Sequence, residues 1–265
     1  METISSIHNP KIKNILKLHK ASERKEQQLF LVEGQKEIDL AIIAGYKIHS
    51  LFWFPGLGIS KNEPEKPEVI GQNIYEINKE IFAKIAYRER PDGLIAIFYM
   101  QNLKLEDLIP NKKSIVIVLE SVEKPGNLGA ILRTADAASV FAIIVCGQRT
   151  DIYNPNVVRS GIGCLFTNQV VSCSNEEAYS WLKKHGFKTY ASALDKNSKP
   201  YCDFDYSGNV AFIMGTESEG LSDFWMKKSD EKIIIPMSGK IDSLNVSTST
   251  AIIVFEAMRQ RKFIK

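Results

Sequence analysis

The sequence predicts an α/β protein in which a small α/β domain precedes a larger domain with a parallel sheet. The chain has 265 residues, which is more than one domain usually holds. In its second half, strand-like and helix-like patterns alternate, and the run 115–119 has the continuous apolar character of a strand buried on both faces. Residues 101–113 are polar and lack a clear period. We therefore expect a domain boundary there, with domains at 1–105 and 112–265.

The first domain is expected to begin with a basic helix. Pro10 opens this segment, and proline suits the first turn of a helix that would continue over 11–24. Cations recur at steps of four, three and four and would form one stripe, at Lys13, Lys17, Lys20 and Arg24. Such a stripe could follow a phosphate backbone, and a solvated surface face would explain the same pattern.

The later elements follow from apolar periodicity and from turn residues. In the first domain we expect strands at 30–33, 46–54, 73–77 and 94–100, and helices at 35–44 and 79–87. In the second domain we expect strands at 114–120, 141–146, 169–172, 187–193, 210–215 and 232–236, and helices at 127–138, 154–162, 175–185 and about 245–262.

Composition restricts the class of protein more than its partners. A hydrophobic fraction of 44% with 25% charged residues is typical of a globular chain. The net charge of +3 is mild, so a nucleic-acid partner would have to be held by local charge. The four cysteines form no CxxC pair, which argues against a zinc site and a redox dithiol. No secretory signal or membrane-length apolar run is present, so we expect a cytoplasmic protein with neither membrane nor metal.

Three loops carry the residues that suggest chemistry, because ligands of parallel sheets bind at the carboxyl ends of the strands. The first loop flanks Asn127 with glycines and leads to Arg133, about two turns into the next helix. The second, 215–221, places two carboxylates between two glycines, and the third, 235–247, is dense in capping residues. Turn and capping chemistry explains each loop singly. Their joint occurrence favours a function, and the absence of a GxGxxG turn disfavours a dinucleotide-binding oxidoreductase.

Together the three loops resemble the SpoU (TrmH-type) branch of the SPOUT methyltransferases. The resemblance covers roughly 115–261 and rests on the motifs NLGAILRTA at 127–135, IMGTESEGL at 213–221, and IPM at 235–237 with DSLNVS at 242–247. The segment FLVEG at 30–34, which follows the basic helix, is similar to the family's ribosomal-protein-type RNA-binding domain. This second similarity favours an RNA contact for the basic stripe.

The resemblance implies a deep trefoil knot in the C-terminal domain, an antiparallel homodimer, and methylation of an RNA ribose 2′-hydroxyl from S-adenosylmethionine. It assigns the transfer site to Asn127, Arg133, Glu217, Ser243 and Asn245. It assigns the cofactor contacts to Gly215, Ile235 and Leu244.

Individual roles follow from side-chain chemistry within that implied site. A guanidinium hardly deprotonates in proteins, so we expect Arg133 to bind the phosphate beside the target ribose rather than to act as a base. Asn127 would orient the same ribose, while Ser243 and Asn245 would position the cofactor and the nucleophile. Glu217 would order its loop or orient Arg133.

Three functions remain open at this point. A ribosomal RNA methyltransferase is favoured because an RNA-binding domain precedes the catalytic one. A transfer RNA methyltransferase would more typically carry a basic extension in place of that domain. A non-catalytic RNA-binding or assembly factor is disfavoured because the implied transfer residues are intact.

Overall fold

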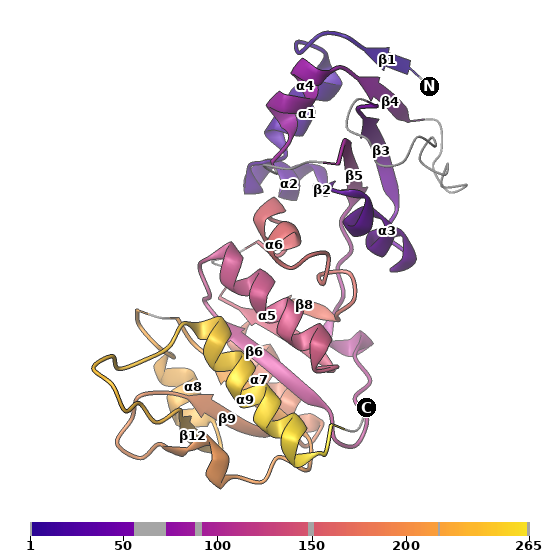
Figure 1. Ribbon diagram of the computed structural model, residues 1–265. Helices are drawn as coiled ribbons and strands as arrows, with labels where there is room; N and C mark the ends of the chain where they lie inside the picture. Colours follow the sequence, from indigo (N-terminus) through magenta and orange to yellow (C-terminus); the bar gives the residue numbers. More distant parts are fainter. Residues whose placement is uncertain (1, 56–72, 88–91, 148–150, 217, 264–265) are drawn as a thin grey trace. The chain divides into compact units, whose positions relative to one another are not determined.

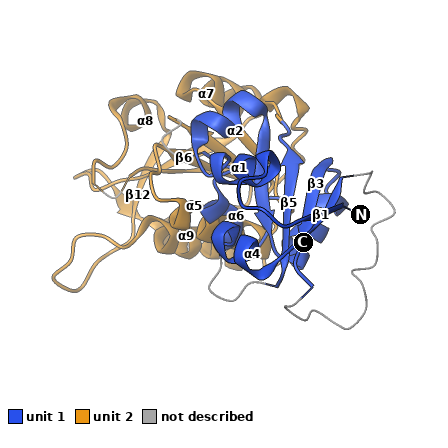
Figure 2. Cartoon of the chain, turned by 90° about the horizontal axis from the view of Figure 1, so that it is seen from above, with its two compact units in different colours: residues 1–101, 151–166 blue, residues 102–150, 167–265 orange. Residues whose placement is uncertain are grey.

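A computed structural model describes residues 2–55, 73–87, 92–147, 151–216 and 218–263 (Figure 1). The chain forms two compact units, which Figure 2 shows in two colours. The N-terminal unit contains Met1–Gln101 and Asp151–Phe166, and the C-terminal unit contains Asn102–Thr150 and Thr167–Lys265. The boundary at Gln101 falls at the predicted linker. The segment Asp151–Phe166, which we predicted within the second domain, has its contacts in the N-terminal unit.

The N-terminal unit is a mixed sheet with helices around it. Its strand order is β1-β4-β3-β5-β2, in which β5 pairs antiparallel with β2 and β3, and β4 pairs parallel with β1 and β3. The elements are β1 (Glu2–Ile4), α1 (Pro10–Lys17), α2 (Ala21–Gln27), β2 (Leu29–Glu33), α3 (Gln35–Ile43), β3 (Ile48–Trp53), β4 (Ile74–Ile77), α4 (Lys79–Ile85), β5 (Leu94–Tyr99) and α6 (Pro155–Ser160).

The predicted basic helix over 11–24 is wrong, because the chain forms two helices instead of one. Asn9 caps α1 by accepting a hydrogen bond from the Lys11 amide at 2.8 Å. Helix α1 ends at Lys17, where the buried Leu18 is its C-cap and still has helical backbone angles, and Lys20 has extended backbone angles before α2 begins. The cations therefore do not lie along a single helix.

Arg24 lies in α2, and its side chain is buried. Its side chain is 1% exposed, forms an ion pair with Asp151 at 2.6 Å and donates to the Leu18 carbonyl at 2.7 Å. Lys13, Lys17 and Lys20 are exposed. The prediction that Arg24 belongs to an exposed stripe is wrong, since this guanidinium is buried and binds acceptors within the unit.

Asp151–Phe166 completes the core of the N-terminal unit. Helix α6 packs on β2, and the Tyr153 ring lies 4.5 Å from the Phe30 ring, measured between centroids. The Tyr153 hydroxyl donates to the Gln101 carbonyl at 2.5 Å, and burial raises the pKa of this phenol well above its ordinary value. The segment is thus fixed by aromatic packing and by buried hydrogen bonds.

The C-terminal unit is built on a parallel sheet, as the sequence predicts. Its strand order is β10-β12-β9-β11-β6-β7-β8, and every strand pair in the described residues is parallel. The elements are β6 (Ile115–Glu120), α5 (Pro125–Ala137), β7 (Ala142–Cys146), β8 (Val170–Cys173), α7 (Asn175–Lys184), β9 (Lys188–Ser192), β10 (Lys199–Pro200), β11 (Val210–Met214), α8 (Asp223–Lys228), β12 (Glu231–Ile234) and α9 (Val246–Gln260).

Helices cover both faces of this sheet, which explains the continuous apolar strands. Helices α5 and α9 lie side by side on one face, and α7 and α8 lie on the other (Figures 1 and 2). Trp181 of α7 and Trp225 of α8 pack in one core cluster with Val116 and Val118 of β6. None of the helices in the described part of the chain has the length and apolarity needed to cross a bilayer.

Candidate active site

A pocket of about 350 Å³ lies at the carboxyl ends of β9, β11 and β12. The segment between β12 and α9 forms its remaining wall. The volume falls within the usual range of small-molecule sites, roughly 300 to 1,000 Å³. The lining includes Gly215, Ile235, Ser243 and Leu244, so the structure brings together four of the residues that the sequence singled out.

Gly215 shapes this pocket because the loop after β11 folds back on it. The Thr216 amide donates to the Gly220 carbonyl at 3.0 Å, and the Gly220 amide donates to the Thr216 carbonyl at 3.1 Å. A Cβ placed on Gly215 would lie 2.3 Å from the Gly220 carbonyl oxygen and 2.7 Å from the Leu221 nitrogen. Only glycine fits this close approach of two backbone segments.

The pocket walls combine apolar and acidic side chains. Met214, Met226 and Met237 contribute thioether surface, while Glu219 and Asp242 contribute exposed carboxylates. Such a lining suits a ligand with an apolar aromatic part and a cationic part, because carboxylates attract positive charge and polarisable sulfur packs well on rings.

Asn127 and Asn245 meet beside the pocket. Asn245 is the N-cap of α9, where its Oδ1 accepts from the Ser247 amide at 2.9 Å and from the Ser247 hydroxyl at 2.6 Å. Its Nδ2 donates to Asn127 Oδ1 at 3.1 Å. This bond joins the start of α5 to the start of α9, so the helix that contains the first motif and the helix that begins in the third motif share one polar junction.

Arg133 lies elsewhere on α5. Its side chain is exposed, lies outside the pocket lining, and has no hydrogen bond or ion pair with the residues that the structure describes. A guanidinium without an internal partner keeps its fork of donors available for an external anion. Glu217, the remaining predicted transfer residue, lies outside the described residues.

Glu120 supports the pocket loop and was missed by the sequence analysis. This carboxylate is 5% exposed and accepts from the Ser222 amide at 2.7 Å, the Ser222 hydroxyl at 2.6 Å and Asn175 Nδ2 at 2.7 Å. Ser222 directly follows the loop that contains Gly215, so Glu120 anchors the end of that loop. A charge that ends an otherwise apolar strand is the signal that could have identified it.

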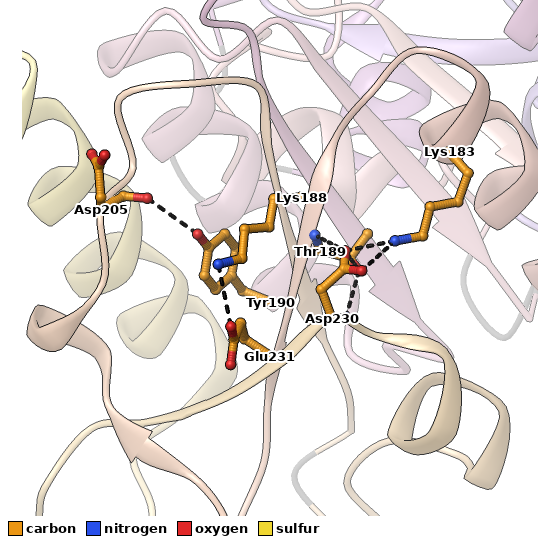
Figure 3. A network of polar contacts seen from close by, with 7 residues as sticks. All are labelled: Lys183, Lys188, Thr189, Tyr190, Asp205, Asp230 and Glu231. Atoms are coloured by element: carbon orange, nitrogen blue, oxygen red, sulfur yellow. Dashed lines mark hydrogen bonds and ion pairs between the residues drawn. The ribbon is translucent and has the colours of Figure 1, made fainter.

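A second polar network fixes β12, which carries another wall of the pocket. Figure 3 shows Asp230 accepting from the Thr189 amide at 2.9 Å, the Thr189 hydroxyl at 2.7 Å and Lys183 Nζ at 2.5 Å. Burial raises the pKa of Asp230, but the hydrogen bonds from Lys183 and Thr189 outweigh it and lower the pKa below its ordinary value. The charged carboxylate therefore ties β12 to β9 and to the end of α7.

Within the described residues, no group of three or more His, Cys, Asp or Glu side chains is arranged to hold a metal ion.

Two family models match the chain. The SpoU rRNA Methylase family matches residues 114–255, and the MRM3-like substrate binding domain matches residues 9–96. The first match includes the three motifs and the pocket, and the second includes most of the N-terminal unit.

Individual relatives match over different lengths. The 23S rRNA (guanosine(2553)-2′-O)-methyltransferase RlmP of Bacillus subtilis is 30% identical over 257 residues, which is 96% of this chain and 98% of that protein. The crystal structure of AdoMet-bound rRNA methyltransferase from Sinorhizobium meliloti has a TM-score of 0.88 and 31% identity, and 97% of each chain is covered. The tRNA (guanosine(18)-2′-O)-methyltransferase of Thermus thermophilus is 35% identical over 159 residues, 60% of this chain and 81% of that protein.

Proposed function

Because the chain belongs to the SpoU rRNA methylase family, it is an RNA ribose 2′-O-methyltransferase that uses S-adenosylmethionine, and we propose that its substrate is ribosomal RNA. The observation that carries this choice is the N-terminal substrate-binding domain at 9–96. The similarity to RlmP extends over that domain, whereas the similarity to the Thermus transfer RNA enzyme covers 60% of the chain. That substrate also favours the expected cytoplasmic location.

The pocket fits S-adenosylmethionine in its chemistry. Gly215 lines the pocket beside the loop that folds back on it, and Ile235 and Leu244 add apolar surface. The exposed carboxylates of Glu219 and Asp242 line the same pocket and would attract a cationic ligand. When bound, S-adenosylmethionine supplies a methyl group that its sulfonium sulfur makes electrophilic.

The remaining task of the protein is to align and activate the ribose. A hydroxyl is a poor nucleophile near neutral pH, so its proton must be removed or the oxyanion stabilised. Arg133 binds the neighbouring phosphate with two parallel donors, and its fixed charge stabilises the developing oxyanion. Asn127 orients the ribose, while Ser243 and Asn245 position the reacting groups. Glu217 orders its loop or orients Arg133.

We also propose the antiparallel homodimer and the trefoil knot that the family resemblance implies. Two features of the C-terminal unit support the dimer. Phe255 of α9 is 41% exposed, which leaves apolar surface for a partner. Arg133 does not line the pocket of its own chain, so a second chain packed on α5 and α9 offers a route to a complete site.

The N-terminal unit would hold RNA by its exposed lysines. We define the basic face as Lys13, Lys17 and Lys20, which are all exposed on or beside α1. Lysine side chains on such a surface bind phosphates by charge and fix the position of the RNA without reading its sequence.

The decisive experiment maps ribose methylation in cells with and without the gene. A 2′-O-methyl group blocks alkaline cleavage at its own linkage, so an alkali-resistant site that disappears with the gene identifies the substrate. We expect one such site in ribosomal RNA. A lost site in transfer RNA would favour the alternative substrate, and methylation on a base with ribose untouched would contradict the assignment.

A further inference from the structure

We propose that His19, Tyr87 and Arg159 form a stacking site for an unpaired RNA base on the N-terminal unit. The proposal rests on RNA being the substrate, and it adds a contact that reads a base face rather than a phosphate. Arg159 lies in the part of the sequence that the methylase model covers, and the other two lie within the substrate-binding model.

Tyr87 is the centre of the site, and its position is fixed although its side chain reaches solvent. The ring is stacked on His19, with centroids 5.9 Å apart and planes inclined by 22°. The Arg159 guanidinium carbon lies over the ring, 5.4 Å from its centroid. Asn156 Nδ2 donates to the Tyr87 hydroxyl at 2.5 Å, and the Tyr87 amide donates to Glu33 at 2.7 Å. Both ends of the residue are therefore anchored.

The exposure of this ring has no evident structural benefit. Tyr87 is 43% exposed, and an exposed aromatic ring forgoes much of the free energy that burial would provide. Ring–ring and cation–ring contacts hold it in place at the surface. A pre-oriented, solvent-exposed aromatic residue in contact with a guanidinium is an arrangement on which proteins stack unpaired bases.

The size of the adjoining notch limits how a base could bind. The notch is lined by His19, Tyr87 and Arg159 with apolar neighbours, and its volume is about 20 Å³. That volume holds about one water molecule. A base cannot enter it and can only stack on the rings and the guanidinium at the rim.

Charge at the rim favours a nucleic acid. Lys20 follows His19 directly, and Lys20 and Arg159 are both exposed. Nearby carboxylates are engaged, since Glu33 accepts from the Tyr87 amide and Asp151 pairs with Arg24. Burial and the neighbouring Arg24 lower the pKa of His19, which keeps its ring neutral and suited to stacking near pH 7.

An unpaired base fits better than a duplex. In an A-form duplex the base faces are covered by neighbouring pairs, so an aromatic side chain reaches them only in loops, bulges and single strands. The basic face can hold either form of RNA by charge, whereas the Tyr87 site would discriminate between them.

The test compares Tyr87→Leu with Tyr99→Leu in the full-length protein. Tyr99 is a matched control because it is 46% exposed in the same unit and contacts His49 edge-on. The probes are a fluorescein-labelled single-stranded adenosine 12-mer and a labelled RNA duplex of equal length, followed by anisotropy over a range of salt. Tyr87→Leu should weaken single-strand binding roughly 5- to 150-fold, the range expected for one lost base stack.

Three further results separate stacking from charge and from folding. Tyr87→Leu should leave duplex affinity and the log–log salt slope unchanged, whereas Arg159→Gln should lower the slope by roughly 0.7. Tyr87→Phe retains the ring and should keep most of the affinity. The proposal is overturned if Tyr87→Leu binds the single strand as Tyr99→Leu does, or if Tyr87→Phe loses as much affinity as Tyr87→Leu in folded proteins.

Failure of this inference can be told from failure of the proposed function. Methylation of ribosomal RNA by a Tyr87→Leu protein with normal single-strand affinity would reject only the stacking site. If Tyr87→Leu loses single-strand affinity but the wild-type protein methylates no ribosomal RNA, only the proposed substrate is rejected.

Discussion

Replacing Gly215 with alanine should weaken S-adenosylmethionine binding, because the added Cβ has no room. It would lie 2.3 Å from the Gly220 carbonyl oxygen, so the loop must open. Opening breaks the two hydrogen bonds between Thr216 and Gly220. At about 0.5 to 1.5 kcal/mol each, their loss amounts to about 1 to 3 kcal/mol. The dissociation constant should rise roughly 5- to 150-fold, since 1.4 kcal/mol corresponds to about tenfold.

Isothermal calorimetry with S-adenosylmethionine measures this effect, and Gly208→Ala is the control. A Cβ on Gly208 would meet no atom within 4 Å, so that variant should bind like the wild type. Thermal unfolding of both variants checks that the fold persists. If Gly215→Ala binds the cofactor within twofold of Gly208→Ala, the loop crossing does not shape the cofactor site and the reasoning fails.

Four further predictions concern Arg133, the basic face, Arg24 and Asp230. Arg133→Lys keeps the charge but loses bidentate hydrogen bonding, so in single-turnover methylation its rate should fall about 10²- to 10³-fold, nearly as much as that of Arg133→Ala. Near-normal turnover of the lysine variant, or abolished cofactor binding in a folded alanine variant, would exclude the phosphate-binding role of Arg133. Alanine at all three basic-face lysines should lower the RNA salt slope by roughly 0.7 to 0.9 per lost contact. Arg24→Ala should instead destabilise the fold by about 3 kcal/mol in urea unfolding, the low end for a broken buried pair because the Asp151 side chain is 26% exposed. An unchanged salt slope in the lysine variant would show that the basic face does not bind RNA. Lost RNA affinity without destabilisation in Arg24→Ala would show that Arg24 binds RNA. The pKa of Asp230 is lowered in the fold, so its charge stabilises the protein at pH values above its ordinary pKa of 3.8, and this stability is lost as the pH falls through the lowered pKa. The free energy of unfolding of the wild type should therefore exceed that of Asp230→Asn by its largest amount at pH 7, and this difference should shrink below about pH 4. A difference that does not change with pH would contradict the prediction.

Local pattern was sufficient to predict the parallel sheet of the C-terminal unit. Strand β6 is apolar from Ile115 to Leu119 because helices cover both of its faces, and this continuous apolar run is visible in the sequence. The position of the pocket was predictable as well, because the carboxyl ends of parallel strands lie at one edge of the sheet and bring the loops at 215–221 and 235–247 together.

Features that depend on distant partners could not be predicted in this way. Arg24 resembles a surface cation at helical spacing until Asp151, more than a hundred residues later, is placed beside it. The break between α1 and α2 contains neither proline nor glycine, so the sequence carries no local signal for it. Glu120 is interpretable only once Asn175 and Ser222 are known to surround it.

The placement of Asp151–Phe166 limits how the two halves of this chain could be recombined. A gene fusion made within 101–113 would join a foreign N-terminal domain to a chain that still carries α6 and Tyr153. Those residues are shaped to pack on this β2 and on Phe30. A working chimera would need its graft to include the 151–166 segment as a second insertion. Modularity in this protein therefore follows the three-dimensional unit rather than the order of the gene.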